Sequence, residues 1–578
     1  MPERLELTKN VQFYKPISKI TKNLINDLLK KGCENKEQGK RYVINKIREI
    51  VEIDNISATF SIRVYPTTRP VFFMDDDLED RIYAFLILIE LNGYLLVLSK
   101  SCANIQAKLN ENFELVQNTE LSKLITQDAE FQKLALKNMT VSGKAIRNRS
   151  YEAENLKGVF SIYAAGRSIP YHIKVREHGT IKSLSSTGRL VESSNRQSLN
   201  EIIIWANNQI NLLNNSSINA FLDYFAKKVQ LQEVLNNNNP SAILIEVAQI
   251  LEKLDSGELD LQYYFNKDRF IKLSSRVKNK LFCELEKVYE INSKFEVVTY
   301  NKTTISKTKN KLSINTNILR KFKIIENNKP EGLIAYINRK GYFSITFDNH
   351  KYMYFMNNCF EDTSGISEID SILELLEPQV AISTVTSEKG KFEESHSIFD
   401  KHSMFGVVEE IFCNDDYILC DDLGDEWADH ITININESCI NFIHSKHGDT
   451  TTSASKLHDV VGQAIKNIGN MNSSKEALEA KFINYKSSNY SNTKISRIRK
   501  QAGNFNNDIS LLLKDHKLHR KCILSCSFIS KQQITTEFLK IKAGKQVKGH
   551  ITQLLWIISS FSHAAKEANV IPIIYCKP

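Results

Sequence analysis

The chain has 578 residues, which is enough for two to four domains with hydrophobic cores of their own. Its 42% hydrophobic and 25% charged residues are ordinary for a soluble globular protein. The most apolar stretch, residues 82–98, contains Glu90 and an Asn92-Gly93 turn, which excludes a membrane span. The ten cysteines form no CxxC pair and the charged start lacks an apolar signal core, so we expect reduced thiols and a cytoplasmic location.

Positive charge is concentrated near the end of the chain. The net charge is only +9, but residues 481–550 contain 15 Lys and Arg against three acidic residues. A basic block of this kind is typical of a surface that binds phosphate groups. The alternative is a solvated, lysine-rich surface without a ligand.

Composition divides the chain into three regions, and the fold class it predicts is a multidomain α/β and α+β protein. Residues 1–235 are expected to form an N-terminal α+β domain, with a break into two subdomains near residue 110. Residues 236–240 (NNNNP) are the predicted linker. Residues 241–395 are expected to form a middle α+β domain with a binding or regulatory role, and residues 396–578 an α/β domain.

Local patterns give further expectations within these regions. Apolar residues at helical spacings predict a helix within residues 121–139, and residues 242–254 are also expected to be helical. Residues 333–337 are expected to form a strand, and the polar residues 383–394 a second linker.

The C-terminal region alternates between helical and strand patterns. Alternation is clearest at residues 430–435 (HITINI), and Ala454, Leu457, Val461 and Ala464 recur at helical spacing. The expected order is helix 397–412, strands 417–420, 430–435 and 439–443, helix 454–468, a polar insertion at 480–507, strand 521–529, helix 549–569 and strand 570–576.

Two charged residues stand at the ends of adjacent predicted strands. Asp429 enters one strand and Lys446 leaves the next, so a hairpin-like pair would bring these positions close together. With the helices on either side, this layout resembles the core of the PD-(D/E)xK nuclease superfamily. The resemblance covers the last third of the chain and implies a restriction-endonuclease-like αβββαβ core.

The resemblance implies a metal-dependent endonuclease that hydrolyses phosphodiester bonds of DNA, or of RNA. Asp429 matches the family's metal-binding Asp, and Lys446 matches the lysine that positions the attacking water. The implied cofactor is Mg²⁺ or Mn²⁺, because carboxylates hold hard divalent cations and such cations polarise phosphate.

The family pattern is broken at one position. The acid expected two residues before Lys446 is His444 here. We expect either that His444 is itself a metal ligand, or that Glu426, Asp421 or Asp422 supplies the missing carboxylate. The remaining alternative is a degenerate, inactive site.

Other residues are placed near the site by the resemblance. Glu410, on the helix before the first strand, is a further candidate metal ligand, with Glu409 as its alternative. Gln463, on the helix after Lys446, is a candidate catalytic residue. Nucleic-acid contacts are expected from basic residues of the C-terminal region, namely Lys456, Lys466, Arg497, Arg499 and Lys500.

Two other functions compete with a nuclease. The first is a nucleic-acid-binding or scaffold protein with an inactive nuclease-like domain, which the loss of the acid at His444 favours. The second is a zinc site from Cys439, His444 and His447, although this spacing matches no common zinc finger. No P-loop or G-x-S-x-G motif is present.

The expected partners follow from the same resemblance. Nucleic acid is the expected ligand, with DNA favoured over RNA and no membrane. A nuclease with large unrelated N-terminal domains resembles effectors of prokaryotic defence against phage or plasmids, which implies a partner defence subunit or a homo-oligomer.

Overall fold

The chain is described from a computed structural model. It describes residues 5–71, 78–139, 148–160, 168–266, 269–299, 303–308, 311–317, 319–326, 329–422, 424, 426–452 and 454–578.

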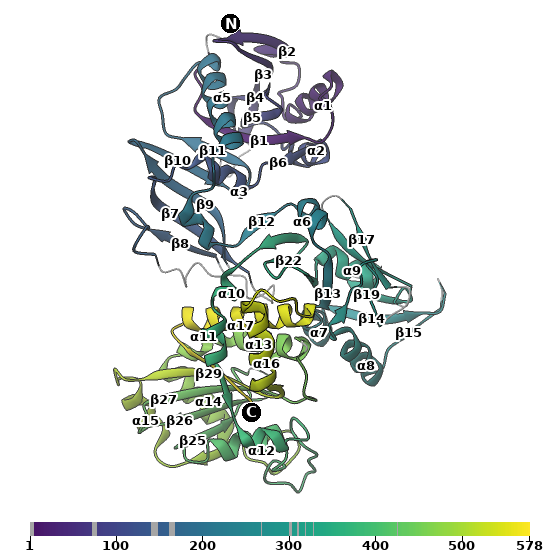
Figure 1. Ribbon diagram of the computed structural model, residues 1–578, viewed down its shortest axis with the longest axis vertical. Helices are drawn as coiled ribbons and strands as arrows, with labels where there is room; N and C mark the ends of the chain where they lie inside the picture. The colour runs from purple at the N-terminus through teal and green to yellow at the C-terminus, as the bar shows by residue number, and fades with distance from the viewer. Residues whose placement is uncertain are drawn as a thin grey trace. The chain divides into compact units, whose positions relative to one another are not determined.

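The protein is a mixed α/β, multidomain molecule that divides into two compact units (Figure 1). The boundary between the units falls between Lys228 and Val229. The polar residues 236–240, expected as a linker, instead span the end of α6 (Leu231–Asn237) and the start of β13 (Pro240–Ile245).

A large sheet forms the first unit. Its order is β2-β3-β4-β5-β1-β11-β10-β9-β7-β8, and β6 pairs with β1. Helix α1 (Lys22–Gly32) buries Leu28 and Leu29 against Leu86 of this sheet. The strands are β1 (Asn10–Pro16), β2 (Ile44–Ile53), β3 (Ile56–Pro70), β4 (Glu79–Leu91), β5 (Tyr94–Lys100), β6 (Phe113–Leu115), β7 (Glu130–Asn138), β8 (Asn148–Glu152), β9 (Ser168–Glu177), β10 (Thr180–Ser185) and β11 (Arg189–Glu192).

The expectation of a helix within residues 121–139 is wrong for most of that stretch. Only α3 (Asn118–Leu121) and the short 3₁₀ helix η2 (Ser122–Leu124) are helical, and β7 follows. Leu134 and Leu136 pair with residues of β8 and are fully buried. A short apolar run fits a buried strand as well as a helix, and pairing with β8 decides the outcome.

The middle region, in the second unit, contains three small sheets. The largest has the order β12-β23-β22-β21-β13-β16, a second has the order β15-β14-β19-β20, and β17 pairs with β18. Besides β13, the strands of these sheets are β12 (Lys227–Val229), β14 (Leu259–Tyr264), β15 (Phe270–Lys272), β16 (Tyr289–Glu290), β17 (Thr303–Lys307), β18 (Leu312–Thr316), β19 (Phe322–Glu326), β20 (Lys329–Gly332), β21 (Phe343–Phe347), β22 (Tyr352–Phe355) and β23 (Asn358–Glu361).

Two local expectations in this region are wrong. Residues 242–254 are not one helix, because β13 occupies their first part and α7 (Ala248–Asp255) the rest. Residues 333–337 lie in α9 (Leu333–Lys340) and not in a strand. Gly341 ends that helix with a φ of 72°, a left-handed conformation that glycine adopts without strain.

A seven-stranded mixed sheet forms the C-terminal part of the second unit, in the order β24-β30-β29-β27-β26-β25-β28. β25, β26 and β27 are antiparallel neighbours, whereas β27, β29 and β30 run parallel. The elements are β24 (Leu376–Pro378), α12 (Met404–Ile411), β25 (Tyr417–Cys420), β26 (His430–Asn434), β27 (Cys439–Lys446), α13 (Ser455–Asn467), α14 (Lys475–Lys486), β28 (Ile498–Gln501), α15 (Phe505–Leu512), β29 (His519–Ser530), α16 (Lys531–Lys542), α17 (Gly549–Glu567) and β30 (Ile571–Lys577).

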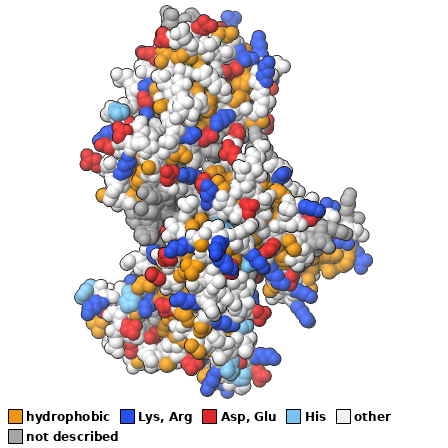
Figure 2. All heavy atoms as spheres, in the orientation of Figure 1, with side chains coloured by type: hydrophobic (Ala, Val, Ile, Leu, Met, Phe, Trp, Pro, Cys, Tyr) orange, Lys and Arg blue, Asp and Glu red, His pale blue; other side chains and the backbone are white. Residues whose placement is uncertain are grey.

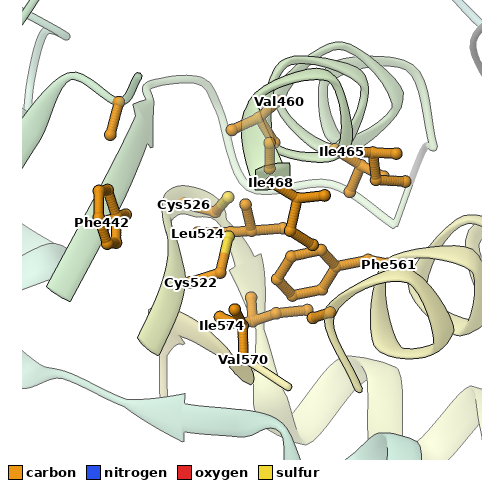
Figure 3. Close-up of a cluster of buried hydrophobic side chains, with 14 of the residues drawn as sticks. Phe442, Val460, Ile465, Ile468, Cys522, Leu524, Cys526, Phe561, Val570 and Ile574 are labelled. Carbon is orange, nitrogen blue, oxygen red and sulfur yellow. The ribbon is translucent and has the colours of Figure 1, made fainter. Parts of the chain in front are cut away.

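The two faces of this sheet are covered by different helices. On one face, α17 packs Phe561 over Leu524 of β29, and Phe442 of β27 belongs to the same core (Figure 3). On the other face, α12 packs Val408 against Ile443. Neighbouring residues of β27 therefore point into different cores, as the alternation of a strand requires.

The middle region and the C-terminal sheet share a core. Leu244 of β13 belongs to the same buried cluster as Phe561 of α17. Gly549, the first residue of α17, lies so close to Ala242 that a Cβ atom there would meet the Ala242 backbone nitrogen at 2.9 Å. In addition, β24 pairs in parallel with β30, so a segment expected in the middle domain completes the C-terminal sheet. Residues 241–395 and 396–578 thus lie in one compact unit.

Among the described residues, no helix combines the length and the apolar character needed to cross a membrane.

Candidate functional site

The loop between β25 and β26 carries the main candidate site. Asp422, Glu426 and Asp429 each point one carboxylate oxygen at a common region, and these oxygens lie within 4.8 Å of one another. We call these three residues the acidic triad. Among the described residues, no other group of three His, Cys, Asp or Glu side chains converges in this way. Three of the four predicted metal ligands are thus brought together.

Burial and neighbouring carboxylates raise the pKa of two residues of the triad, Asp429 and Glu426. Burial raises the pKa of Asp429 well above its ordinary value, and the carboxylates of Asp422 and Glu426 raise it further. The backbone N–H of Ser445 donates to Asp429 Oδ2 at 2.6 Å, which opposes the rise. Burial and Asp422 likewise raise the pKa of Glu426. Additional positive charge at this point would therefore be favourable.

Asp421, which precedes the triad, anchors the loop to α14. Its carboxylate is fully buried and accepts hydrogen bonds from Lys481 Nζ at 2.6 Å, from the hydroxyl of Tyr485 and from the backbone N–H of Trp427. Because the Trp427 bond spans the loop, Asp421 holds the segment that carries Glu426 against the end of β25. Asp421 has a structural role here, and its side chain is not a member of the triad.

The lysine paired with the triad is Lys389. Its Nζ lies 2.5 Å from Asp422 Oδ2, and its charge also acts on Asp429. Its Nζ lies over the ring of Phe405, at 5.4 Å from the centroid, and Tyr490 donates its hydroxyl to the same Asp422 oxygen at 2.7 Å. Sequence reasoning missed Lys389 because it lies in the polar residues 383–394, which have no periodicity.

The segment that carries Lys389 is fixed to the start of α12. The N–H of Met404 donates to the carbonyl of Ser387 at 2.9 Å, and the N–H of Phe405 donates to the carbonyl of Glu388 at 3.1 Å. The expectation of a linker here is therefore wrong for residues 387 and 388. The sequence holds one local signal near this contact, the N-cap residue Ser403. It marks the start of α12 but does not reveal which segment packs against that start.

Lys446 belongs to a different cluster. Its Nζ lies 2.8 Å from Asp459 Oδ2 on α13 and 3.9 Å from Glu388 Oε2. Burial by itself would lower the pKa of Lys446, but these carboxylates outweigh it and raise the pKa. Glu286 lies near the same group, and burial together with Asp459 raises its pKa to about 7. Lys446 thus ends β27 as predicted, with its charge matched by acids outside the triad.

His444, expected as a metal ligand or catalytic residue, is not part of the acidic triad. It is 2% exposed, and its Nε2 has no hydrogen-bond partner among the described residues. Burial lowers its pKa to about 4, so the imidazole is neutral at pH 7. Cys439, His444 and His447, which are all among the described residues, do not bring their ligand atoms together, so the structure gives no support to a zinc site there.

Two further predicted residues lie on exposed surfaces. Glu410 faces solvent on α12, and Gln463 faces solvent on α13. The glutamate of α12 that points inward is Glu409, which accepts from Arg499 Nε at 2.5 Å and lies 3.7 Å from His430 Nε2. Neither Glu410 nor Gln463 joins the triad.

The predicted nucleic-acid-binding residues have mixed environments. Arg497 is 8% exposed and donates to the carbonyl of Cys420, and Arg499 is occupied by Glu409. These internal partners do not support a contact of either arginine with nucleic acid. The others lie closer to solvent: Lys500 donates to the carbonyl of Cys413, Lys456 to that of His447, and Lys466 is exposed on α13.

Comparison of the chain with protein-family models, with curated proteins and with solved structures found no match. Function is therefore inferred from the residues and their geometry.

The anchoring role of Asp421 can be tested by stability. Asp421→Ala would leave Lys481 and Tyr485 buried without their carboxylate partner, and breaking a buried charge pair costs about 3–5 kcal/mol. We expect a loss of this size in the free energy of unfolding, measured with urea. Asp370→Ala is the matched control, since its ion pair with Lys542 is exposed and is worth less than about 1 kcal/mol. Equal losses in both variants would contradict the role.

His444 predicts a pH dependence of stability. The pKa is about 4 in the folded chain and about 6.5 when unfolded, so only the unfolded chain binds this proton between those values. Stability is therefore lost as the pH falls through this window, by about 2 kcal/mol between pH 7.5 and pH 5. His444→Phe should show a correspondingly smaller loss in urea unfolding at the two pH values. His516→Phe, at an exposed histidine, should keep the wild-type loss.

Proposed function

We propose that the C-terminal part of this chain is a divalent-metal-dependent nuclease that hydrolyses phosphodiester bonds of nucleic acid. The observation that carries the proposal is the acidic triad, three carboxylates converging at one end of a mixed sheet. Isolated acidic residues are common on surfaces, but buried carboxylates are costly unless a positive charge compensates them.

The triad fits a hard divalent cation. All three side chains offer carboxylate oxygens, which Mg²⁺ and Mn²⁺ prefer over softer ligands. Lys389 offsets one of the three negative charges, yet burial and, after it, the neighbouring carboxylates still raise the pKa of Asp429 and of Glu426. Asp422, Glu426 and Asp429 would hold the ion. When bound, such an ion withdraws charge from a phosphodiester group.

The arrangement of elements supports the same proposal. The helix, three strands and helix α12, β25, β26, β27 and α13 follow one another as the resemblance implies, and the next strand, β29, comes after the inserted elements α14, β28 and α15. Asp429 stands immediately before β26, and its carboxylate accepts from the backbone of β27 next to Lys446. This position of Asp429 supports the metal-binding role proposed for it.

Lys389 supplies a role that the resemblance assigns to Lys446. An ammonium group beside the acids attracts the anionic oxygens of a phosphodiester and stabilises the negative charge that develops during hydrolysis. The ammonium of Lys389 is paired with the triad, whereas that of Lys446 is paired with Asp459. We therefore assign the charge-stabilising role to Lys389.

A second candidate function is a protein that binds nucleic acid without cutting it. Two observations favour it: His444 stands where the family has its second acid, and Lys446 is held by Asp459. Such a protein would bind the same ligand, nucleic acid, as the proposed nuclease but would not hydrolyse it. The preference for DNA, the cytoplasmic location, the defence role and a partner subunit remain predictions from the sequence.

Metal binding and cleavage are tested together with Asp429→Asn. We expect the wild-type protein to bind Mn²⁺ and to cut plasmid DNA or labelled RNA. Binding is measured as the loss of the electron paramagnetic resonance signal of free Mn²⁺. The substitution removes one charged ligand, so both Mn²⁺ affinity and cleavage should fall at least 100-fold. Glu437→Gln removes an exposed acid from the β26–β27 turn and should change neither.

The outcomes separate the two candidate functions. Absence of Mn²⁺ binding to the wild type, or cleavage unchanged in Asp429→Asn, would contradict the proposed site. Mn²⁺ binding and nucleic-acid binding without any cleavage would favour the second function.

The lysines are distinguished by Lys389→Met and Lys446→Met. Methionine is unbranched and of similar length, so Lys389→Met should remove the charge that lies over the Phe405 ring while an apolar side chain still fills the space. We expect cleavage to fall at least 100-fold while Mn²⁺ binding tightens, because the competing ammonium is gone. Normal cleavage by Lys389→Met together with inactivity of a folded Lys446→Met would return the role to Lys446.

A further inference from the structure

An exposed aromatic surface lies on the small sheet of the middle region. β15 is the edge strand of the sheet β15-β14-β19-β20, and large side chains at the end of the β14–β15 hairpin are about half exposed on both of its faces: Phe270 (50%) on the face of Tyr264, and Ile271 (47%) and Phe265 (48%) on the face of Tyr263. Figure 2 shows hydrophobic side chains at the right of the view, where Figure 1 places β14 and β15, with Lys and Arg side chains beside them. Large side chains of this kind are normally buried, so their exposure points to a function.

Strand register places aromatic and basic side chains on the same face. Tyr264 pairs with Phe270, and Gln262 pairs with both Lys272 of β15 and Lys323 of β19. Residues two apart in a strand share a face, so these five residues lie on one side of the three strands. We call Tyr264, Phe270, Lys272 and Lys323 the aromatic–basic face.

This face is directed away from the core. Leu259 and Leu261, on the alternate positions of β14, belong to the buried cluster of the middle region. Lys272 is 75% exposed, and its partner Asp260 lies 3.4 Å away. Phe270 and Lys272, at the edge of the sheet, are thus the part of the aromatic–basic face that is open to a ligand, whereas Gln262 between the lysines is buried.

The geometry within the face suits a planar ligand that carries negative charge. The rings of Tyr264 and Phe270 are stacked, with centroids 5.2 Å apart and an interplanar angle of 23°. Lys323 Nζ lies 4.2 Å from the centroid of Tyr264. A stacked aromatic platform flanked by ammonium groups provides both elements by which proteins hold single strands, which are base stacking and phosphate attraction.

We propose that the aromatic–basic face binds single-stranded nucleic acid, with a base stacking on the exposed ring of Phe270, which Tyr264 supports from behind, and phosphates paired with Lys272 and Lys323. The proposal rests on the proposed function for the identity of the ligand, and it adds a binding surface remote in sequence from the acidic triad. A duplex keeps its base faces stacked and inaccessible, so the face should prefer single strands over duplexes.

Charge and ring geometry favour nucleic acid over a lipid surface. On a membrane-binding strand, leucine can enter the lipid in place of phenylalanine, because insertion needs only apolar area. Here the aromatic rings form a stacked pair with a lysine above one of them. The two ligands can be distinguished by replacing Phe270 with leucine, because base stacking needs an aromatic ring whereas insertion into lipid needs only apolar area.

The test is binding of a fluorescein-labelled 20-nucleotide single strand, followed by fluorescence anisotropy in EDTA. Without metal, binding is measured apart from cleavage. We expect Phe270→Ala and Phe270→Leu each to weaken binding about tenfold, and Phe270→Tyr to retain it. Lys323→Gln should weaken binding and reduce the salt dependence of the association constant by about one ion. Tyr83→Ala, at an aromatic residue that is 60% exposed on β4, is the matched control and should leave affinity unchanged.

Each outcome bears on the proposal. Wild-type affinity in Phe270→Ala, equal weakening by Tyr83→Ala, or duplex bound more tightly than single strand would overturn it. Full affinity in Phe270→Leu, with sedimentation of the protein on phosphatidylglycerol vesicles, would identify a lipid-binding surface instead. Thermal melts of each variant separate lost contacts from lost folding. A wild type that binds the strand in EDTA but fails to cut it with Mn²⁺ would refute the nuclease and leave this surface standing.

Discussion

The arrangement of the candidate site depends on the buried carboxylate of Asp421. A fully buried charge is tolerated only when it is paired and hydrogen-bonded, and Asp421 achieves this with Lys481, Tyr485 and the N–H of Trp427. Two of these partners come from α14 and one from the far side of the same loop. The loop is therefore fixed at both ends, which places Glu426 beside Asp422 and Asp429 despite their mutual repulsion. The contribution of such a network is mainly to define one conformation, since the desolvation of its charges offsets much of their attraction.

Two neighbouring clusters of acidic residues each hold one lysine: the acidic triad holds Lys389, and Asp459 with Glu388 holds Lys446. Glu388 and Lys389 are consecutive residues, and they reach different clusters: Glu388 approaches Lys446, whereas Lys389 pairs with Asp422. The segment that carries them is tied to the first turn of α12 by backbone hydrogen bonds. A short polar segment thus connects the charge balance of the triad with that of Lys446. Glu286, from the end of α8 (Ser275–Leu285), brings the middle region into the second of these clusters.

The sequence predicted the part of the fold that has strong periodicity. Ile431 and Ile433 alternate along β26, and Leu457, Val461 and Ala464 mark one face of α13, so their elements could be located within a few residues. Residues 121–139 and 333–337 were assigned to the wrong type of element, because a short apolar run is compatible with a helix or a strand until its pairing partner is known. For the site, proximity in sequence allowed Asp422, Glu426 and Asp429 to be grouped in advance. Lys389 could not be found this way, since its position depends on a tertiary contact of a segment without pattern.

Charge counting had a similar limit. The 15 basic residues of 481–550 predicted a phosphate-binding surface, yet several of them neutralise internal groups: Lys481 is paired with Asp421, and Arg499 with Glu409. A local excess of positive charge in the sequence therefore need not remain an excess on the surface, because acids distant in the chain fold against it. The aromatic–basic face shows the converse. Lys272 and Lys323 lie far apart in sequence and do not form a charged run, but pairing of β14 with β15 and β19 places them on one face beside stacked rings. Strand register, which the charge count does not contain, decides which positive charges can meet a polyanion.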